Sequence, residues 1–196
     1  RRPERRVGPG VCDARRMHLA ELVAASNAVA ANPARLEKAR ILSELLAQLE
    51  PAEVPIAVAF LAGRLRQGRI GLGHSTLWDA RENPPQPEAP GLFDAPGVDA
   101  PLTLRDVDAA LDRLARARGK GVSDQRARIL GELYARASTE ERDFLERLLL
   151  AELRQGALAG AMVDAVARAS QVPVAKIRRA AMLAGDLEPV AVAALT

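Results

Sequence analysis

KARILSELLAQLEPAEVPIAVAFLAGRLRQG, residues 38–68, is matched 88 positions later by RARILGELYARASTEERDFLERLLLAELRQG, residues 126–156. Thirteen of the 31 aligned positions are identical without a gap, and both copies contain the run Ala-Arg-Ile-Leu. After a three-residue gap, WDA at 78–80 falls on VDA at 163–165. A match of this length indicates two copies of one structural unit. Two copies are too few for an open solenoid, so we expect one globular domain with pseudo-twofold symmetry.

The composition and patterning predict an all-α fold. Apolar residues make up 48% of the chain but aromatic residues only 3%, so the core must be built from Leu, Val, Ile and Ala. Alternation of apolar and polar residues with a period of two is nowhere sustained, which argues against strands. We expect one helix from Pro51 to about Gln67, and further helices that are capped at Asn32, Ser75, Thr103, Ser123 and Ser138.

The chain divides into an arm, two helical repeats and a linker. Residues 1–16 hold six Arg, one Glu and one Asp, a net charge of +4, which leaves about −1 for residues 17–196. We interpret this arm as disordered or as an extension created by the choice of gene start; a nucleic-acid-binding arm is the alternative. Residues 17–81 form the first repeat and 103–196 the second, both in one domain. The proline-rich residues 82–102 join them as a linker or irregular loop.

Several function classes are excluded by what the sequence lacks. Cys12 is the only cysteine, and His18 and His74 are too few to suggest a metal centre. No apolar run reaches membrane-spanning length and no signal peptide is visible, so we expect a cytoplasmic protein without a membrane partner. No motif of a nucleotide-binding loop, a nucleophile–base pair or a metalloprotease appears, so a stand-alone catalyst has no support. Trp78 and Met162 occupy apolar helix positions and are expected in the core.

A glycine-rich loop follows Leu-Arg-Gln-Gly in each copy and is the best candidate for a binding site. Glycines let the backbone approach a partner, and the helix that follows offers free N–H groups to a phosphate. The alternative is an ordinary helix C-terminus, in which glycine ends the helix and arginine faces its dipole. The candidate residues are Arg66, Gly68, Arg69, Gly71, Gly73 and Ser75 in the first copy, and Arg154 and Gly156 in the second.

A second basic run, Arg113 to Arg128, surrounds another glycine-rich helix start at Lys120 and Gly121. These two residues are further candidates for phosphate contact. A solvated helix face is the alternative interpretation.

The motifs together resemble the N-terminal DNA-binding domain of ATP-dependent DNA ligases of the bacterial type. In the second half the resemblance rests on Gly121-x-Ser123, RILGEL at 128–133, LLLAELRQGALAGAMVDAVARAS at 148–170 and RRAAMLAGDLEPVA at 178–191. In the first half, RIGLGHSTL at 69–77 is similar to the family's Gly-x-Gly loop before a Ser/Thr-Leu helix. The resemblance covers about residues 17–196.

The resemblance implies a helical domain that binds nicked duplex DNA without sequence specificity, on the backbone and minor groove. It places Gly71, Gly73, Ser75, Arg154 and Gly156 at the DNA; Arg66 and Arg69 are added from charge and position. Glu152 departs from the family, whose larger members often carry a basic residue there.

The resemblance also implies a catalytic core after Thr196, with nucleotidyltransferase and OB-fold domains, that uses ATP and Mg²⁺ to seal nicks in replication, repair and recombination. No cofactor is expected in this chain. We expect a non-catalytic monomer, associated with the nucleoid when bound to DNA. The alternative is a HEAT-like helical scaffold that binds protein.

Overall fold

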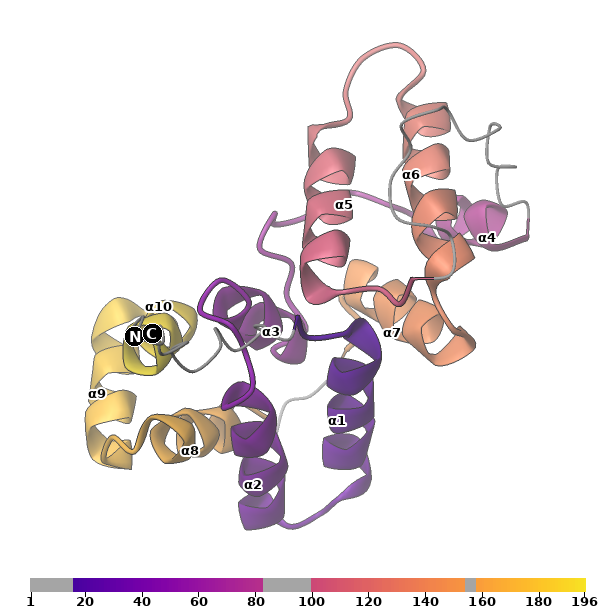
Figure 1. The fold of residues 1–196 in the computed structure, drawn as a ribbon. Coiled ribbons are helices and arrows are strands. Elements are labelled where there is room, and N and C mark those ends of the chain that lie inside the picture. Colours follow the sequence, from indigo (N-terminus) through magenta and orange to yellow (C-terminus); the bar gives the residue numbers. More distant parts are fainter. Residues whose placement is uncertain (1–15, 83–99, 154–157) are drawn as a thin grey trace, which may run out of the picture.

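The fold, seen in a computed structural model, covers residues 16–82, 100–153 and 158–196; residues 1–15, 83–99 and 154–157 lie outside the described residues. Within the described ranges the regular elements are ten α-helices and no strand, which confirms the all-α class (Figure 1). The helices are α1 (Leu19–Ala31), α2 (Arg35–Leu46), α3 (Val54–Leu61), α4 (His74–Glu82), α5 (Leu104–Arg116), α6 (Val122–Arg136), α7 (Thr139–Leu149), α8 (Leu158–Ser170), α9 (Val174–Ala184) and α10 (Glu188–Leu195).

The two halves meet at the starts of α1 and α5. His18 and Thr103, the residues before these helices, form an isolated antiparallel bridge. Each half donates one backbone hydrogen bond to the other: Leu19 N to Leu102 O at 2.7 Å, and Leu104 N to Met17 O at 3.0 Å. The two bonds are reciprocal, so the same local structure occurs once in each half.

The helices exchange partners between the halves. α1 packs on α7 and α5 on α3, while α2 packs on α8 and α6 on α4. Neither half is therefore a separate packing unit. The two-repeat organisation stays a prediction, and this exchange is the pattern that a pseudo-twofold axis would produce.

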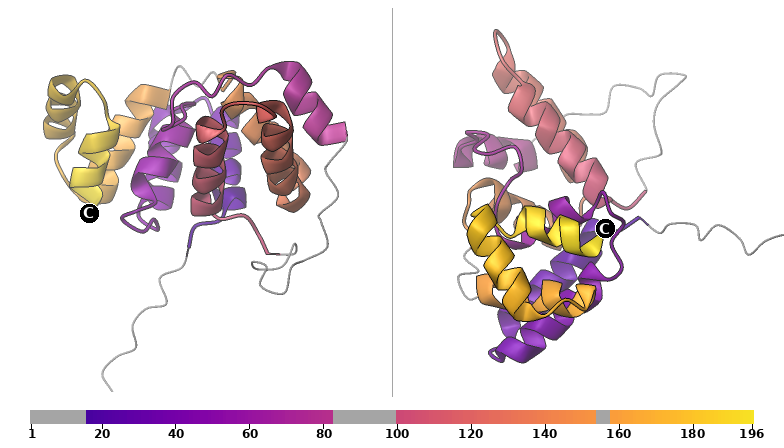
Figure 2. Two further views of the ribbon diagram at one scale, coloured as in Figure 1. Left: turned by 90° about the horizontal axis from the view of Figure 1, so that it is seen from above. Right: turned by 90° about the vertical axis from the view of Figure 1, so that its left-hand side faces the viewer.

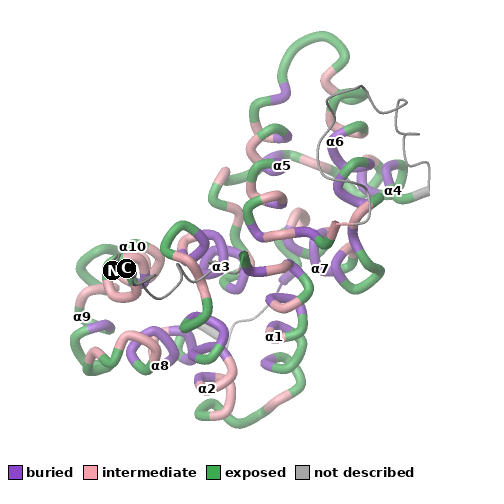
Figure 3. Tube along the Cα trace, in the orientation of Figure 1, coloured by how far each residue is buried: buried purple, intermediate pink, exposed green. Residues whose placement is uncertain are grey.

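The apolar core is shared by the two halves and follows the inner faces of the helices (Figure 3). Two carboxylates lie buried in it, Glu53 and Glu141, which occupy the same position in the two copies. Each accepts a backbone hydrogen bond from the residue three positions earlier, Glu50 N at 3.1 Å and Ser138 N at 2.7 Å. A carboxylate bonded in this way satisfies an N–H group that would otherwise be unpaired at a helix start.

The predicted caps are partly confirmed. Thr103 and Ser138 each accept the amide three residues on, at 3.2 Å, and form the expected capping boxes. Caps at Asn32, Ser75 and Ser123 are wrong. α2 begins two residues later than Asn32 would require, because the Asn32 side chain accepts from Ala34 N in a local turn. α4 and α6 begin one residue before Ser75 and Ser123, so both serines lie within the first turn.

Candidate nucleic-acid interface

The first glycine loop, residues 62–73, begins earlier than expected. The helix predicted from Pro51 to about Gln67 is only Val54–Leu61, and the chain then turns at Gly63 with φ of +69°. Gly63 N donates to Phe60 O and Arg64 N to Ala59 O, both at 2.9 Å, which is the Schellman pattern of a helix end. Gly63 must be glycine, since a Cβ there would lie 2.7 Å from the carbonyl oxygen of Leu153.

Leu65 to Gly68 form a separate turn beyond this helix end, in which Gly68 N donates to Leu65 O at 3.1 Å. The alternative that Leu-Arg-Gln-Gly ends the helix is therefore wrong for the first copy. In the second copy α7 ends at Leu149, and Ala151 takes the left-handed conformation with φ of 56°. Arg154 and Gly156 lie outside the described residues.

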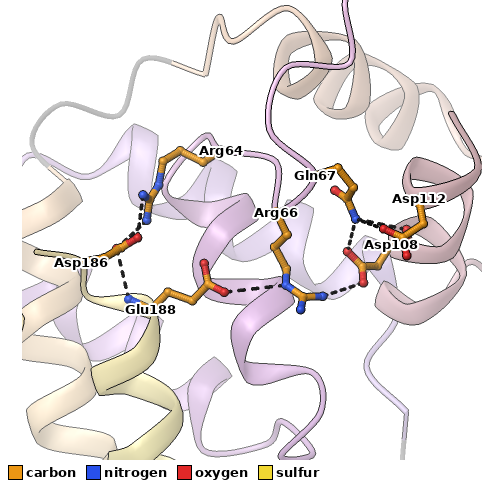
Figure 4. Close-up of polar contacts among 7 residues, drawn as sticks. All are labelled: Arg64, Arg66, Gln67, Asp108, Asp112, Asp186 and Glu188. Carbon is orange, nitrogen blue, oxygen red and sulfur yellow. Dashed lines mark hydrogen bonds and ion pairs between the residues drawn. The ribbon is translucent and has the colours of Figure 1, made fainter. Parts of the chain in front are cut away.

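Two arginines tie the loop to neighbouring helices (Figure 4). Arg64 donates two hydrogen bonds to the Asp186 carboxylate, at 2.7 and 2.8 Å, and thereby lowers the pKa of Asp186. Arg66 lies between two carboxylates, with Nη1 at 2.7 Å from Asp108 and Nε at 3.7 Å from Glu188. The loop is thus held to the start of α10 on one side and to α5 on the other.

Gln67 extends the contact with α5. Its Nε2 donates to the carboxylates of Asp108 at 2.9 Å and Asp112 at 2.8 Å (Figure 4). Gln67 is not among the residues predicted from the sequence, although the two aspartates at i and i+4 mark one acidic face of α5. Together, Arg66 and Gln67 fix the turn from which the rest of the loop extends.

The candidate residues beyond this turn are accessible. Gly68, Arg69, Gly71, Gly73 and Ser75 are exposed, whereas Ile70 is buried and anchors the segment. Arg69 has no ion-pair partner among the described residues. Gly68 and Gly71 take positive φ, +71° and +69°. Because Ser75 lies in the first turn of α4, its amide is one of the N–H groups that a helix leaves without an internal acceptor.

The two copies contribute to one groove of ≈ 370 Å³ beside this loop. One wall comes from the first loop and the other from the end of α7. In Figure 2 (left), the segment between α3 and α4 runs along one edge of the molecule. The lining residues are Gly63–Leu65, Gly68–Leu72 and Leu148–Ala151. The structure therefore brings Gly68, Arg69 and Gly71 together with the segment that leads into the second loop.

The second basic run lies elsewhere. Lys120 is exposed in the turn between α5 and α6, and Gly121, with φ of +78°, precedes α6 (Figure 1). A separate groove of ≈ 490 Å³ lies beside Gly121 and includes Arg113, Arg116 and Arg128. Lys120 and Gly121 thus do not join the groove of the first loop.

Trp78 is not in the core, contrary to the prediction, but 64% exposed, while Met162 is buried as predicted. Helix periodicity places Leu77 and Ala80 inward and leaves Trp78 outside. In the part of the chain that the structure describes, no helix is long and apolar enough to span a membrane. No group of three potential metal ligands occurs in that same part.

Comparison with known proteins places these features in context. Residues 94–167 match the family model described as DNA ligase N terminus. A "Probable DNA ligase" of Anaeromyxobacter sp. (strain Fw109-5) is 52% identical over 91% of this chain, and one of Sorangium cellulosum (strain So ce56) is 49% identical over 91%. A "Probable DNA ligase" of Rhodococcus jostii (strain RHA1) is 46% identical over 91% of the chain. The chain spans about a third (32–33%) of the length of these relatives.

Proposed function

We propose that this chain is the DNA-binding domain of an ATP-dependent DNA ligase, because residues 94–167 match the DNA ligase N-terminus family model and 91% of the chain aligns with a "Probable DNA ligase". Its substrate is nicked duplex DNA, held through the phosphate backbone and minor groove without sequence specificity. The structural observation that supports the proposal is the groove between the first glycine loop and the end of α7. It occurs in a chain whose relatives are named as DNA ligases.

Phosphates are held by backbone amides and by Arg69, which has no ion-pair partner among the described residues. The exposed residues Arg69, Gly71, Gly73 and Ser75 offer main-chain N–H groups and the positive end of the α4 dipole, an arrangement suited to phosphate oxygens. Arg69 supplies charge beside them, and Arg154 and Gly156, which lie outside the described residues, stay predicted contacts. Contacts of this kind position a protein on DNA but carry no sequence information.

Arg66 contributes chiefly by fixing the loop. Its guanidinium already lies between Asp108 and Glu188, so a phosphate would have to compete with two carboxylates. DNA contact by Arg66 remains a prediction. Lys120 and Gly121 form a second, more distant phosphate contact on the turn between α5 and α6.

The chemistry belongs to the two thirds of the ligase that this chain does not cover. That catalytic core uses ATP and Mg²⁺ to seal the nick in replication, repair and recombination, in the cytoplasm at the nucleoid. The DNA-binding domain is a monomer and supplies affinity. Residues 17–196 carry a net charge of about −1, so binding is weak, with a Kd of roughly 10⁻⁴–10⁻⁶ M. A protein-binding HEAT-like scaffold is not favoured, because the relatives are named as ligases.

The test is fluorescence anisotropy of a nicked duplex at two salt concentrations, with two matched charge reversals. Arg69 and Arg179 are both exposed and have no partner among the described residues, but Arg179 lies on α9, away from the groove. Arg69→Glu is expected to weaken binding about tenfold, and Arg179→Glu less than about twofold. Equal effects of the two variants, or binding that does not depend on salt, would contradict the proposal.

A further inference from the structure

Two corresponding pairs of helices differ in whether a third helix packs across them. α10 packs against both α3, from the first repeat, and α8, from the second. By the 88-residue register α3 corresponds to α7, and by the alignment after the three-residue gap α8 corresponds to α4. No described helix packs extensively against both α7 and α4. A groove of ≈ 360 Å³ lies between them instead.

Three of the residues that line this α4–α7 groove are apolar. Leu77 and Trp78 come from α4, and Leu150 follows the end of α7. Trp78 is 64% exposed, whereas its counterpart Val163 in the other half packs against the core. A large aromatic ring beside two leucines, in an open groove, is the kind of anchor on which a partner helix gains most of its binding energy.

The charges around the groove differ from those that hold α10. Arg64 binds Asp186, the residue two positions before α10 begins, and the residue that corresponds to Arg64 is Glu152. Among the described residues, the Glu152 carboxylate lies 3.7 Å from His74 Nε2. A helix seated here would therefore meet an acidic group where α10 meets a basic one.

The other charged residues around the groove leave its charge negative. Arg81 is already paired with Asp143 at 3.4 Å and Glu146 at 3.3 Å, and Asp79 adds a further carboxylate. The groove is acidic around an apolar centre. It suits a helix whose apolar face covers Trp78 and whose start carries a basic residue.

We propose that the α4–α7 groove seats an amphipathic helix with a Lys or Arg two positions before its first residue, supplied by the rest of the ligase polypeptide. The relatives are about three times as long as this chain, so most of that polypeptide lies outside it. The source of the helix rests on the proposed function. The chemistry of the groove does not.

The first test is a charge exchange with a peptide probe. The probe has the sequence of residues 186–196, held helical by a lactam between Pro189→Glu and Ala193→Lys, which replace the exposed positions of α10. One form carries Asp186→Lys and the matched form keeps Asp. Trp78 is the only tryptophan of the chain, so its emission reports on the groove directly.

The Lys form is expected to shift Trp78 emission to shorter wavelength and to bind roughly fivefold more tightly than the Asp form. In the Glu152→Arg variant this preference should reverse. Equal binding of the two forms, or an unchanged preference in the variant, overturns the proposal. A blue shift that grows with chain concentration in the absence of peptide would overturn it as well, because a second copy would then occupy the groove.

The second test concerns the source of the helix. In the longer ligase polypeptide, Trp78→Ser is expected to lower nick sealing at least about fivefold, while residues 1–196 with the same change bind nicked DNA within about twofold of wild type. Unchanged sealing would show that the helix does not come from the same polypeptide. If wild-type residues 1–196 did not bind nicked DNA, the proposed function would be refuted. The peptide test of the groove would not be affected.

Discussion

At the level of single residues, the two copies place different residue types at one left-handed backbone position. Gly63 and Ala151 occupy the same register and both take left-handed φ, +69° and 56°, at the ends of α3 and α7. Glycine adopts this conformation without cost, whereas alanine carries a penalty of roughly 1–2 kcal/mol. Gly63 has a second constraint, because the Leu153 carbonyl leaves no room for a side chain.

Exchanging these two residues should have opposite effects on stability. Ala151→Gly is expected to raise the free energy of unfolding by about 0.5–1 kcal/mol, since the strain is relieved. Gly63→Ala is expected to lower it by more than about 2 kcal/mol, because strain and the contact with Leu153 add. Urea unfolding followed by circular dichroism measures both. A Gly63→Ala variant as stable as wild type would contradict the described approach of the two loops.

The residues of the candidate site could be chosen from sequence only in part. Glycine, arginine and helix-start signals are local, so the exposed segment from Gly68 to Ser75 was recognisable. The ion pairs of Arg66 were not, because Asp108 and Glu188 come from distant parts of the sequence. Trp78 was assigned to the core from its apolar character alone, and only the direction of the α4 face shows it to be exposed.

At the scale of elements, the position of the first loop depends on what holds its ends. Arg64 binds Asp186 next to α10, while Arg66 and Gln67 bind α5. Local patterns predicted the capping boxes at Thr103 and Ser138, because both partners lie within four residues. The end of α3 was predicted six residues too late, since the turn at Gly63 is set by packing against the second copy.

The Arg64–Asp186 ion pair should be visible in the pH dependence of stability. The hydrogen bonds from Arg64 lower the pKa of Asp186 below its usual 3.8, so the stabilisation is complete above that value and is lost as pH falls through the lowered pKa. The Tm difference between wild type and Asp186→Asn should therefore shrink as pH falls below 3.8. Thermal unfolding at a series of pH values measures this. Arg64→Gln is the matched control and should flatten the same part of the curve; a difference that grows in acid would contradict the assignment.

At the scale of the whole molecule, the halves depend on each other. α2 finds its main partner in α8 and α4 in α6, and the reciprocal hydrogen bonds at His18 and Thr103 join the two halves directly. The repeat in the sequence predicted two related units. It could not predict that they exchange helices, because similarity between copies carries no information on which copy packs against which.

A single half should therefore not fold alone. Residues 16–82 expressed as a fragment are expected to show little helix and no cooperative thermal transition, because their helices lack the apolar partners supplied by residues 100–196. Circular dichroism of the fragment beside the whole chain measures this. A sharp melting transition in the fragment would show that the halves are independent domains.

Binding of DNA phosphates by the backbone of the first glycine loop can be tested residue by residue. A ¹H–¹⁵N correlation spectrum of the 20.9 kDa chain, titrated with a short nicked duplex, observes those amides one by one. We expect the largest shifts at Arg69, Gly71, Gly73 and Ser75, whose amides are available to phosphate, and we expect these shifts to disappear at high salt. Shifts confined to α9, or to the turn at Lys120 with the loop unchanged, would contradict it.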